Sequence, residues 1–359
     1  MEESRVLRWE RGEEAPTVPK LGELAEAYHR PLAVFLLQAP PNEPPSPPDM
    51  RVIGSRYGEL AFSEKTLLAI RRARRIQQLT LGLDPAHNAR RLEKLKQQLV
   101  REPPDNAASV LAVETGAYSG SPPRFENPYK ALSYWRRLVE ALGILALQFP
   151  MPIEDARGFT LPDPKCPTLV VNRSDLPRAR IFTLFHELGH IIQRREGVCD
   201  LGASVRESRV PPVESWCNAF AGAFLVPTKD FLTEWRPWPR GEDPPDEELR
   251  RLSGRYQVSE TVILRRLLAV GAISVSQYRA GAERRSASFD RPKSARALEV
   301  KRNMPSEKVA EFGSSFVRLV LSGAAAGELS LGDVADILDV RVKHLSAISD
   351  RIARLSAET

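Results

Sequence analysis

The chain has 359 residues, a formal net charge of +6 and 42% hydrophobic residues, values of an ordinary globular protein. No stretch approaches the roughly 20 uncharged apolar residues that a membrane span needs. The charged beginning, MEESRVLRWERGEE, lacks the apolar run of a secretory signal. Three cysteines without a C-x-x-C pair indicate neither a disulfide framework nor a thiolate zinc cluster. We therefore expect a cytoplasmic protein without a membrane partner.

Changes of composition divide the chain into six segments. Apolar strand candidates and amphipathic helices in the middle of the chain predict an α+β fold, mainly helical with a small sheet, flanked by helical N- and C-terminal regions. The predicted segments are an N-terminal helical part (1–37), a proline-rich linker (38–50), a basic helical region with a loop (51–127), the α+β domain (128–285), a polar linker (286–303) and a C-terminal helical region (304–359).

The basic charge is concentrated in residues 64–102, which hold ten Lys and Arg against four acids. Their pattern predicts a helix and a second helix, interrupted near GLDPAHN. A solvated helix face is the preferred interpretation, and contact with nucleic acid or an acidic partner is the alternative. The following residues, 102–128, are expected to form a loop.

Two later segments have a weak helix-turn-helix appearance. The sequence of residues 245–280 predicts two helices with a turn at Val258 and Ser259. We prefer an ordinary helical pair over a helix-turn-helix for this segment. For the C-terminal segment, an ordinary helical core is likewise the preferred interpretation of LSLGDVADILDVRVKHLSAI.

The stretch FTLFHELGH, residues 182–190, carries the strongest chemical signal. Pro177 suits the first turn of a helix through it. His186 and His190 lie one turn apart, on the side opposite an apolar stripe. The stripe consists of Ile181, Leu184, Phe185, Leu188 and Ile192.

Histidines four apart on a helix can bring two imidazole nitrogens to one zinc ion at about 2.0 to 2.1 Å. Glu187 then points to the open side of the ion, where it takes a proton from the attacking water and passes it to the leaving amine. A third ligand is needed. The candidates further along the chain are Asp200, Glu207 and Glu214. Glu214 is preferred because it lies in the first turn of a second helix, with Asn218 one turn further on the same face. Glu207 is the alternative.

These residues resemble the ImmA/IrrE metallopeptidases between about residues 128 and 280. The resemblance rests on TLVVNRSDLPRARIFTLFHELGHII and ESWCNAFAGAFLVP. It implies a zincin-like domain with one zinc per chain, held by His186, His190 and Glu214, and Glu187 as general base or acid. It also implies a substrate, a helix-turn-helix repressor encoded nearby whose cleavage releases genes of mobile elements, toxin–antitoxin pairs or stress responses.

The N-terminal residues LRWERGEEAPTVPKLGELAEAYHRPLAVFL resemble the latter half of an Xre-type helix-turn-helix domain. Trp9, Glu10 and Gly12 precede Pro16 and Thr17 as in repressors fused to this peptidase. The helices that clamp phosphate and aim the reading helix would come before them. We therefore expect a remnant packing module, or a start codon placed too far downstream, rather than specific DNA binding through this segment.

The leading hypothesis is a zinc-dependent endopeptidase that cleaves a partner protein of the Xre repressor type. The alternative is a DNA-binding transcriptional regulator or antitoxin in which the peptidase fold is a scaffold. Residues that could stabilise an oxyanion are Arg178, Arg180 and Tyr256.

Overall fold

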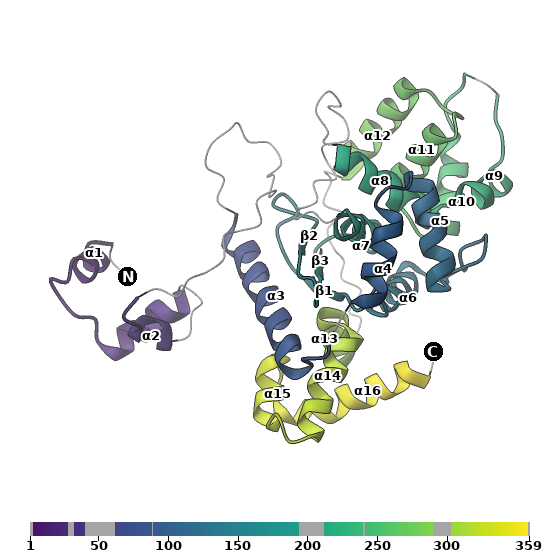
Figure 1. Ribbon diagram of the computed structural model, residues 1–359. Coiled ribbons are helices and arrows are strands. Elements are labelled where there is room, and N and C mark those ends of the chain that lie inside the picture. The colour runs from purple at the N-terminus through teal and green to yellow at the C-terminus, as the bar shows by residue number, and fades with distance from the viewer. Residues whose placement is uncertain are drawn as a thin grey trace. The chain divides into compact units, whose positions relative to one another are not determined.

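A computed structural model describes residues 3–27, 32–39, 62–87, 89–193, 212–239, 241–289 and 303–357 (Figure 1). The two predicted linkers lie largely outside these residues. The chain forms two compact units, Met1–Ser46 and Pro47–Thr359. Among the helices that the structure describes, none is long and apolar enough to cross a membrane.

The first unit contains α1 (Glu3–Glu10), α2 (Val18–Ala27) and a 3-10 helix, η1 (Leu32–Leu36). Ala25 is the buried hydrophobic residue among those described in this unit, whereas Val18 and Leu36 are 67% and 68% exposed. The described part of the unit thus lacks a core of its own. Its resemblance to half of an Xre-type domain stays a prediction.

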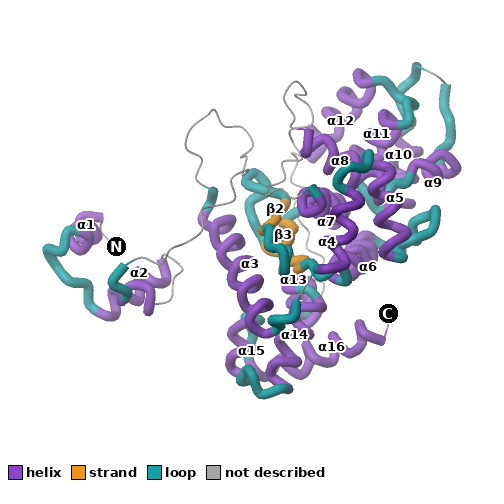
Figure 2. Tube along the Cα trace, viewed as in Figure 1, coloured by secondary structure: helices purple, strands orange, loops and turns teal. Residues whose placement is uncertain are grey.

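The second unit is built around a three-stranded sheet in the order β1–β3–β2 (Figure 2). The strands are β1 (Leu145–Phe149), β2 (Gly158–Leu161) and β3 (Thr168–Asn172). β1 runs parallel to β3, with Leu147 opposite Val170, and β2 runs antiparallel to it, with Phe159 opposite Val170. All three strands are buried along their length, which fits their largely apolar sequences.

The two faces of the sheet contribute to different hydrophobic cores, because side chains alternate along a strand. Leu169 and Val171 of β3 pack in one core with α7 (Pro177–Ile192) and α8 (Pro212–Leu225), whereas Val170 packs in the other with α3 (Glu64–Leu83) and the C-terminal helices. Figures 1 and 2 show the sheet between these two groups of helices. The α+β, mainly helical fold is therefore confirmed.

The second unit contains α3, thirteen further α-helices and one 3-10 helix among its described residues. They are α3 (Glu64–Leu83), α4 (Arg90–Leu99), α5 (Pro104–Thr115), α6 (Pro128–Glu140), α7 (Pro177–Ile192), α8 (Pro212–Leu225), α9 (Thr228–Glu234), α10 (Asp246–Tyr256), α11 (Glu260–Ala269), α12 (Val275–Phe289), α13 (Met304–Phe312), α14 (Ser314–Ala325), α15 (Leu331–Ile337), the 3-10 helix η3 (Val342–His344) and α16 (Leu345–Ala357).

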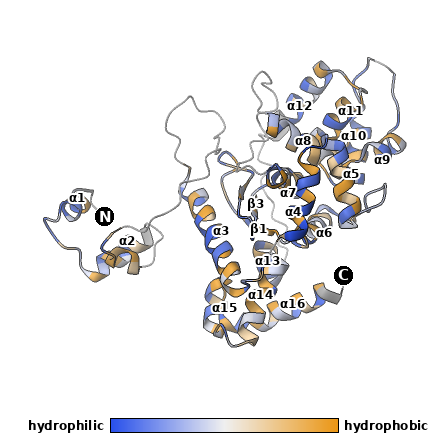
Figure 3. Cartoon of the chain, viewed as in Figure 1, coloured by the Kyte–Doolittle hydropathy of each residue, from blue (hydrophilic) through white to orange (hydrophobic). Residues whose placement is uncertain are grey.

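The expected loop over residues 102–128 is wrong, because α5 occupies its first half. Pro104 stands at the start of this helix, where a missing N–H costs nothing, and Gly116 ends it with a positive φ of 68°. Ala108 and Leu111 bury its apolar face, which packs against α8. Figure 3 shows α5 as largely hydrophobic beside the hydrophilic α4.

The basic segment folds as the two predicted helices, which contribute to different cores. Ile70 and Ile76 of α3 pack with the C-terminal helices, and Leu92 and Leu95 of α4 pack with α5. Arg72 lies over the rings of Phe149 and Phe312 and pairs with Glu311 at 2.5 Å. The basic residues are therefore divided between two helices that pack in different cores.

Helices α13 to α16 pack in the core that also contains α3 and Val170 of β3. The C-terminal region is helical, as predicted. Arg136 of α6 is buried and its guanidinium donates to the carbonyl oxygens of Ala146 (2.7 Å) and Ala310. Glu140 accepts from Ser314 Oγ at 2.6 Å. A side chain at Gly313 would meet Glu140 Oε1 at 2.5 Å. These contacts fix the junction of α13 and α14 on α6 and β1.

Candidate metal centre

Helices α7 and α8 pack closely because a glycine lies at their contact. A Cβ atom at Gly189 would lie 3.0 to 3.2 Å from the Sγ, Cβ and Cα atoms of Cys217. Only a residue without a side chain allows this approach without displacement. Cys217 follows Glu214 by three residues, so the contact brings the first turn of α8 level with the histidines of α7.

The structure brings His186, His190 and Glu214 together in a cluster in which both histidines are buried and Glu214 is partly exposed. Nε2 of His186 lies 3.0 Å from Nε2 of His190 and 3.3 Å from Oε2 of Glu214. Nε2 of His190 lies 3.1 Å from Oε1 of Glu214. Two ligand atoms bound at about 2.0 to 2.1 Å to one tetrahedral ion lie about 3.3 Å apart. The two imidazole nitrogens and the carboxylate oxygens of Glu214 therefore have the spacing that a shared metal ion requires.

The protonation of His186 supports the same conclusion. Its Nδ1 lies 3.1 Å from Oδ1 of Asn218. An amide oxygen only accepts, so Nδ1 carries the proton and Nε2 presents a lone pair. Burial lowers the pKa of His186 and keeps the ring neutral. The lone pair and the carboxylate of Glu214 are then two acceptors facing one another, an arrangement that a cation stabilises.

Glu187 is completely buried beside this cluster. Neither of its carboxylate oxygens has a hydrogen-bond partner among the described residues. Burial raises its pKa well above the usual value, and the charge of Glu214 adds to the rise. A buried carboxyl group without a partner is costly and is characteristic of a functional site rather than of a packed core.

The start of α7 is held by Asn172, the last residue of β3. Its amide nitrogen donates to the carbonyl oxygens of Met151 at 3.0 Å and Ala156 at 2.8 Å, and its Oδ1 accepts from Ser174 N at 2.9 Å. This one buried side chain joins the β1–β2 connection to the turn before Pro177. The position of the motif helix on the sheet follows from these bonds.

The three candidates for an oxyanion partner all make contacts elsewhere. Arg178 donates to Ser253 Oγ at 2.7 Å, and Arg180 donates to Gln148 Oε1 at 3.0 Å. The hydroxyl of Tyr256 donates to Asp230 Oδ2 at 2.8 Å.

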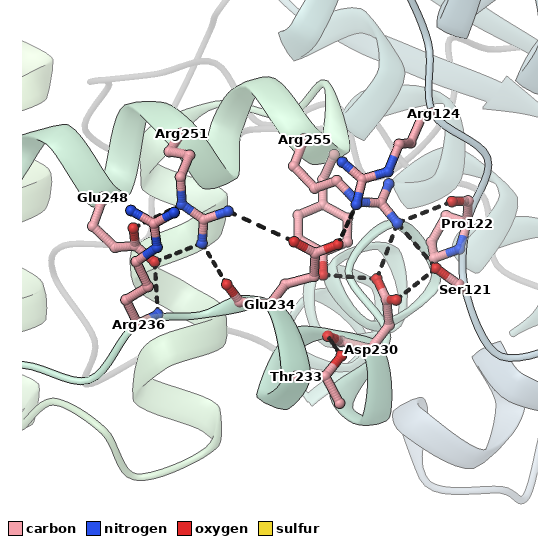
Figure 4. Close-up of polar contacts among 11 residues, drawn as sticks. Ser121, Pro122, Arg124, Asp230, Thr233, Glu234, Arg236, Glu248, Arg251 and Arg255 are labelled. Carbon is pink, nitrogen blue, oxygen red and sulfur yellow. Dashed lines mark hydrogen bonds and ion pairs between the residues drawn. The ribbon is translucent and has the colours of Figure 1, made fainter.

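Through Asp230, Tyr256 joins a polar network. Figure 4 shows this network between α9, α10 and the loop before α6. Asp230 accepts from Ser121 Oγ at 2.5 Å and pairs with the buried Arg255 at 3.3 Å. Arg255 also pairs with Glu234 at 3.1 Å. The network fixes the helices that follow α8. The alternative ligands Asp200 and Glu207 lie outside the described residues.

An α+β domain that joins two helix histidines, a glutamate of a second helix and a buried carboxyl group has the architecture of H-E-x-x-H metallopeptidases. The comparison with protein families agrees with this class. Residues 139–268 match the peptidase M78 family model, described as the IrrE N-terminal-like domain. The match contains all four site residues, covers less than half of the chain and supports the ImmA/IrrE resemblance.

Among solved structures, a Mycobacterium tuberculosis transcriptional regulator is similar at 23% sequence identity with a TM-score of 0.30. The similarity covers 46% of this chain and 46% of the regulator, so it spans less than half of that protein. No curated protein matches the chain.

Proposed function

We propose that the protein is a zinc-dependent endopeptidase. The observation that carries the proposal is the mutual spacing of 3.0 to 3.3 Å among the donor atoms of His186, His190 and Glu214. Two imidazoles and one carboxylate leave the fourth position of a tetrahedral zinc site open, as in catalytic sites. The match of residues 139–268 to a peptidase family supports the same reaction class.

Zinc bound there would supply Lewis acidity, which polarises a carbonyl group and makes water more acidic. His186 and His190 would hold the ion through their imidazole nitrogens, and Asn218 would hold His186 in the required tautomer. Glu187 is the general base that takes a proton from the attacking water and then gives it to the leaving amine. Its complete burial keeps bulk water from competing for that proton.

The substrate we propose is a partner protein, specifically an Xre-type repressor. The support is the ImmA/IrrE resemblance of the sequence motifs together with the family match over the same residues. Cleavage would make the protein a regulator that acts through proteolysis.

The experiment uses the zinc-loaded full chain and an Xre-type repressor encoded beside it, with cleavage followed by intact mass spectrometry. The wild type should give two fragments. Glu187→Gln should keep the zinc and lose at least about a hundredfold in rate, because general base catalysis contributes about that much. A Glu187→Gln protein that cuts at the wild-type rate would sink the mechanism, and an intact repressor with wild-type enzyme would overturn the substrate assignment.

A further inference from the structure

The C-terminal helices α15 and α16 are joined by a short turn, residues 338–341, and the 3-10 helix η3 leads directly into α16. Asp339 in this turn has a φ of 51°, in the left-handed region. The N–H of Val340 donates to the carbonyl oxygen of Ala335 at 2.9 Å, which closes the end of α15. A turn of three or four residues between two helices is typical of a helix-turn-helix, and it often contains a glycine because one position is left-handed.

The inner sides of the two helices belong to the core of the fold. The buried side chains of the pair are Val334, Ala335, Leu338, Leu345, Ile348 and Ile352. They lie in one core with Phe316 and Val320 of α14, and α14 contacts both α15 and α16. This is the helical core that the sequence indicates for the segment. It holds α16 from its inner side.

The outer side of α16 is exposed, which distinguishes this pair from α10 and α11. Those two helices are also joined by a turn with a left-handed residue, Gln257, but α11, which is described in full, has one exposed residue, Ala269. The exposed residues of α16 include Ser346, Ala347, Ser349, Asp350, Ala353 and Arg354. The second helix of a helix-turn-helix reads a nucleic acid with its outer face. Of these two pairs, α15 and α16 meet that condition.

The charge of the second helix suits a polyanion. Residues 341–357 hold one acid, Asp350, and four basic residues, Arg341, Lys343, Arg351 and Arg354. The other acids of the motif, Asp333, Asp336 and Asp339, lie on α15 and in the turn. Asp333 accepts from Ser330 N at 2.8 Å in the capping box of α15, and Asp339 pairs with Lys308 at 3.0 Å. Negative charge on α15 and positive charge on α16 therefore direct a phosphate-rich partner to α16.

We propose that α14 to α16 form a DNA-binding helix-turn-helix in which α16 lies in the major groove of a duplex. Ser346 and Ser349, one turn apart near the start of α16, face the base edges, which offer partners to a hydroxyl group. Lys343 and Arg354 contact the phosphates on either side. This function is separate from peptide cleavage and uses no group of the metal centre.

The test mixes the full chain with a pool of random-sequence DNA duplexes, and the retained duplexes are amplified and sequenced over several rounds. We expect one sequence motif to be enriched. Lys343→Glu should bind the selected duplex about tenfold more weakly, and its log affinity should fall less steeply with log salt, by about one unit of slope, because one phosphate contact is lost. Ser346→Val should reduce the preference for the selected duplex over a scrambled one about fivefold and leave affinity for the scrambled duplex unchanged.

Lys94→Glu is the matched control, because Lys94 is also an exposed lysine but belongs to α4, which packs in the other core. It should keep the wild-type affinity and salt slope. Both lysine variants should keep the wild-type thermal transition, since both side chains are exposed.

Three results would overturn the proposal: a pool without an enriched motif, equal losses for Lys94→Glu and Lys343→Glu, or an unchanged preference in Ser346→Val. A pool without an enriched motif together with a change of oligomeric mass in Lys343→Glu would assign the face to a protein partner instead. The assay needs no cleavage, so a chain that binds the selected duplex but cuts no repressor would overturn only the proposed function.

Discussion

Asn218 and His186 form a buried hydrogen bond of 3.1 Å between helices α8 and α7. Glu214, one turn earlier on α8, meets the other nitrogen of the same imidazole at 3.3 Å. One helix therefore contributes both a ligand and the group that orients a ligand of the neighbouring helix. The metal centre depends on the register between these two helices as much as on the histidines.

Replacing Asn218 by Leu should weaken zinc binding by about 10- to 100-fold, the usual cost of losing a partner of a metal ligand. The reason is that His186 loses the acceptor that fixes its proton on Nδ1. Zinc affinity measured by competition with a chelator checks this. Asn218→Asp keeps an acceptor oxygen and should stay close to the wild type, and an Asn218→Leu protein with wild-type affinity would show that the bond has no such role.

Gly189→Ala should move α8 away from α7, because the new methyl group would meet backbone and side-chain atoms of Cys217 at 3.0 to 3.2 Å. We expect a loss of about 1 to 3 kcal/mol in the free energy of unfolding from overpacking, with weaker zinc binding. Chemical denaturation and metal competition measure the two effects. Gly254→Ala in α10 is the control, since nothing lies within 4 Å of its Cβ position. It should be neutral or stabilising by up to about 1 kcal/mol.

The metal-free protein should lose stability as the pH falls below about 6.5, the ordinary pKa of histidine. Burial lowers the pKa of His186 in the folded chain, so the unfolded chain binds the proton first. The loss begins at the unfolded pKa and ends at the lower folded one, with a slope of at most about 1.4 kcal/mol per pH unit. Urea denaturation at pH 7.5 and 5.5 should show a larger decrease for the wild type than for His186→Gln. Equal decreases would mean that His186 is not buried as a neutral ring.

Arg255→Ala should destabilise the fold by about 3 to 5 kcal/mol, because it leaves the nearly buried carboxylate of Asp230 without its charged partner. Thermal and chemical denaturation test this. Arg284→Ala removes an ion pair with Asp243 in which both side chains are about half exposed, 57% and 48%. That control should change the stability by less than about 1 kcal/mol. Equal effects of the two substitutions would contradict the structural role of the network.

The sequence was informative where one local pattern decides the structure. Pro177 and the apolar stripe predict α7, and the two prolines before Glu214 predict α8, because each signal acts within one or two helical turns. The sequence did not predict β2, since GFTL is too short to show alternation and its role depends on the contact of Gly158 with α7. The misplaced loop at 102–128 has a similar cause. Its prolines and glycines suggested turns, yet Pro104 and Gly116 are the two ends of α5.

The candidate site divides in the same way. The H-E-x-x-H motif and helix periodicity point to His186, His190 and Glu187, whereas the choice of Glu214 needed the relation between two helices. Packing at Gly189 decides that relation, and its signal in the sequence is a single glycine between the histidines. Tyr256 and the two arginines were plausible by residue type, but the partners they contact come from distant parts of the chain.

The most direct test of the metal centre is the zinc content of the purified full chain beside His186→Ala and Glu214→Ala, prepared under reducing conditions with zinc supplied. We predict about one zinc per wild-type chain and little in either variant, because each substitution removes one of three ligands. A wild type without bound zinc, or variants that keep it, would contradict the three-ligand site and the peptidase function built on it.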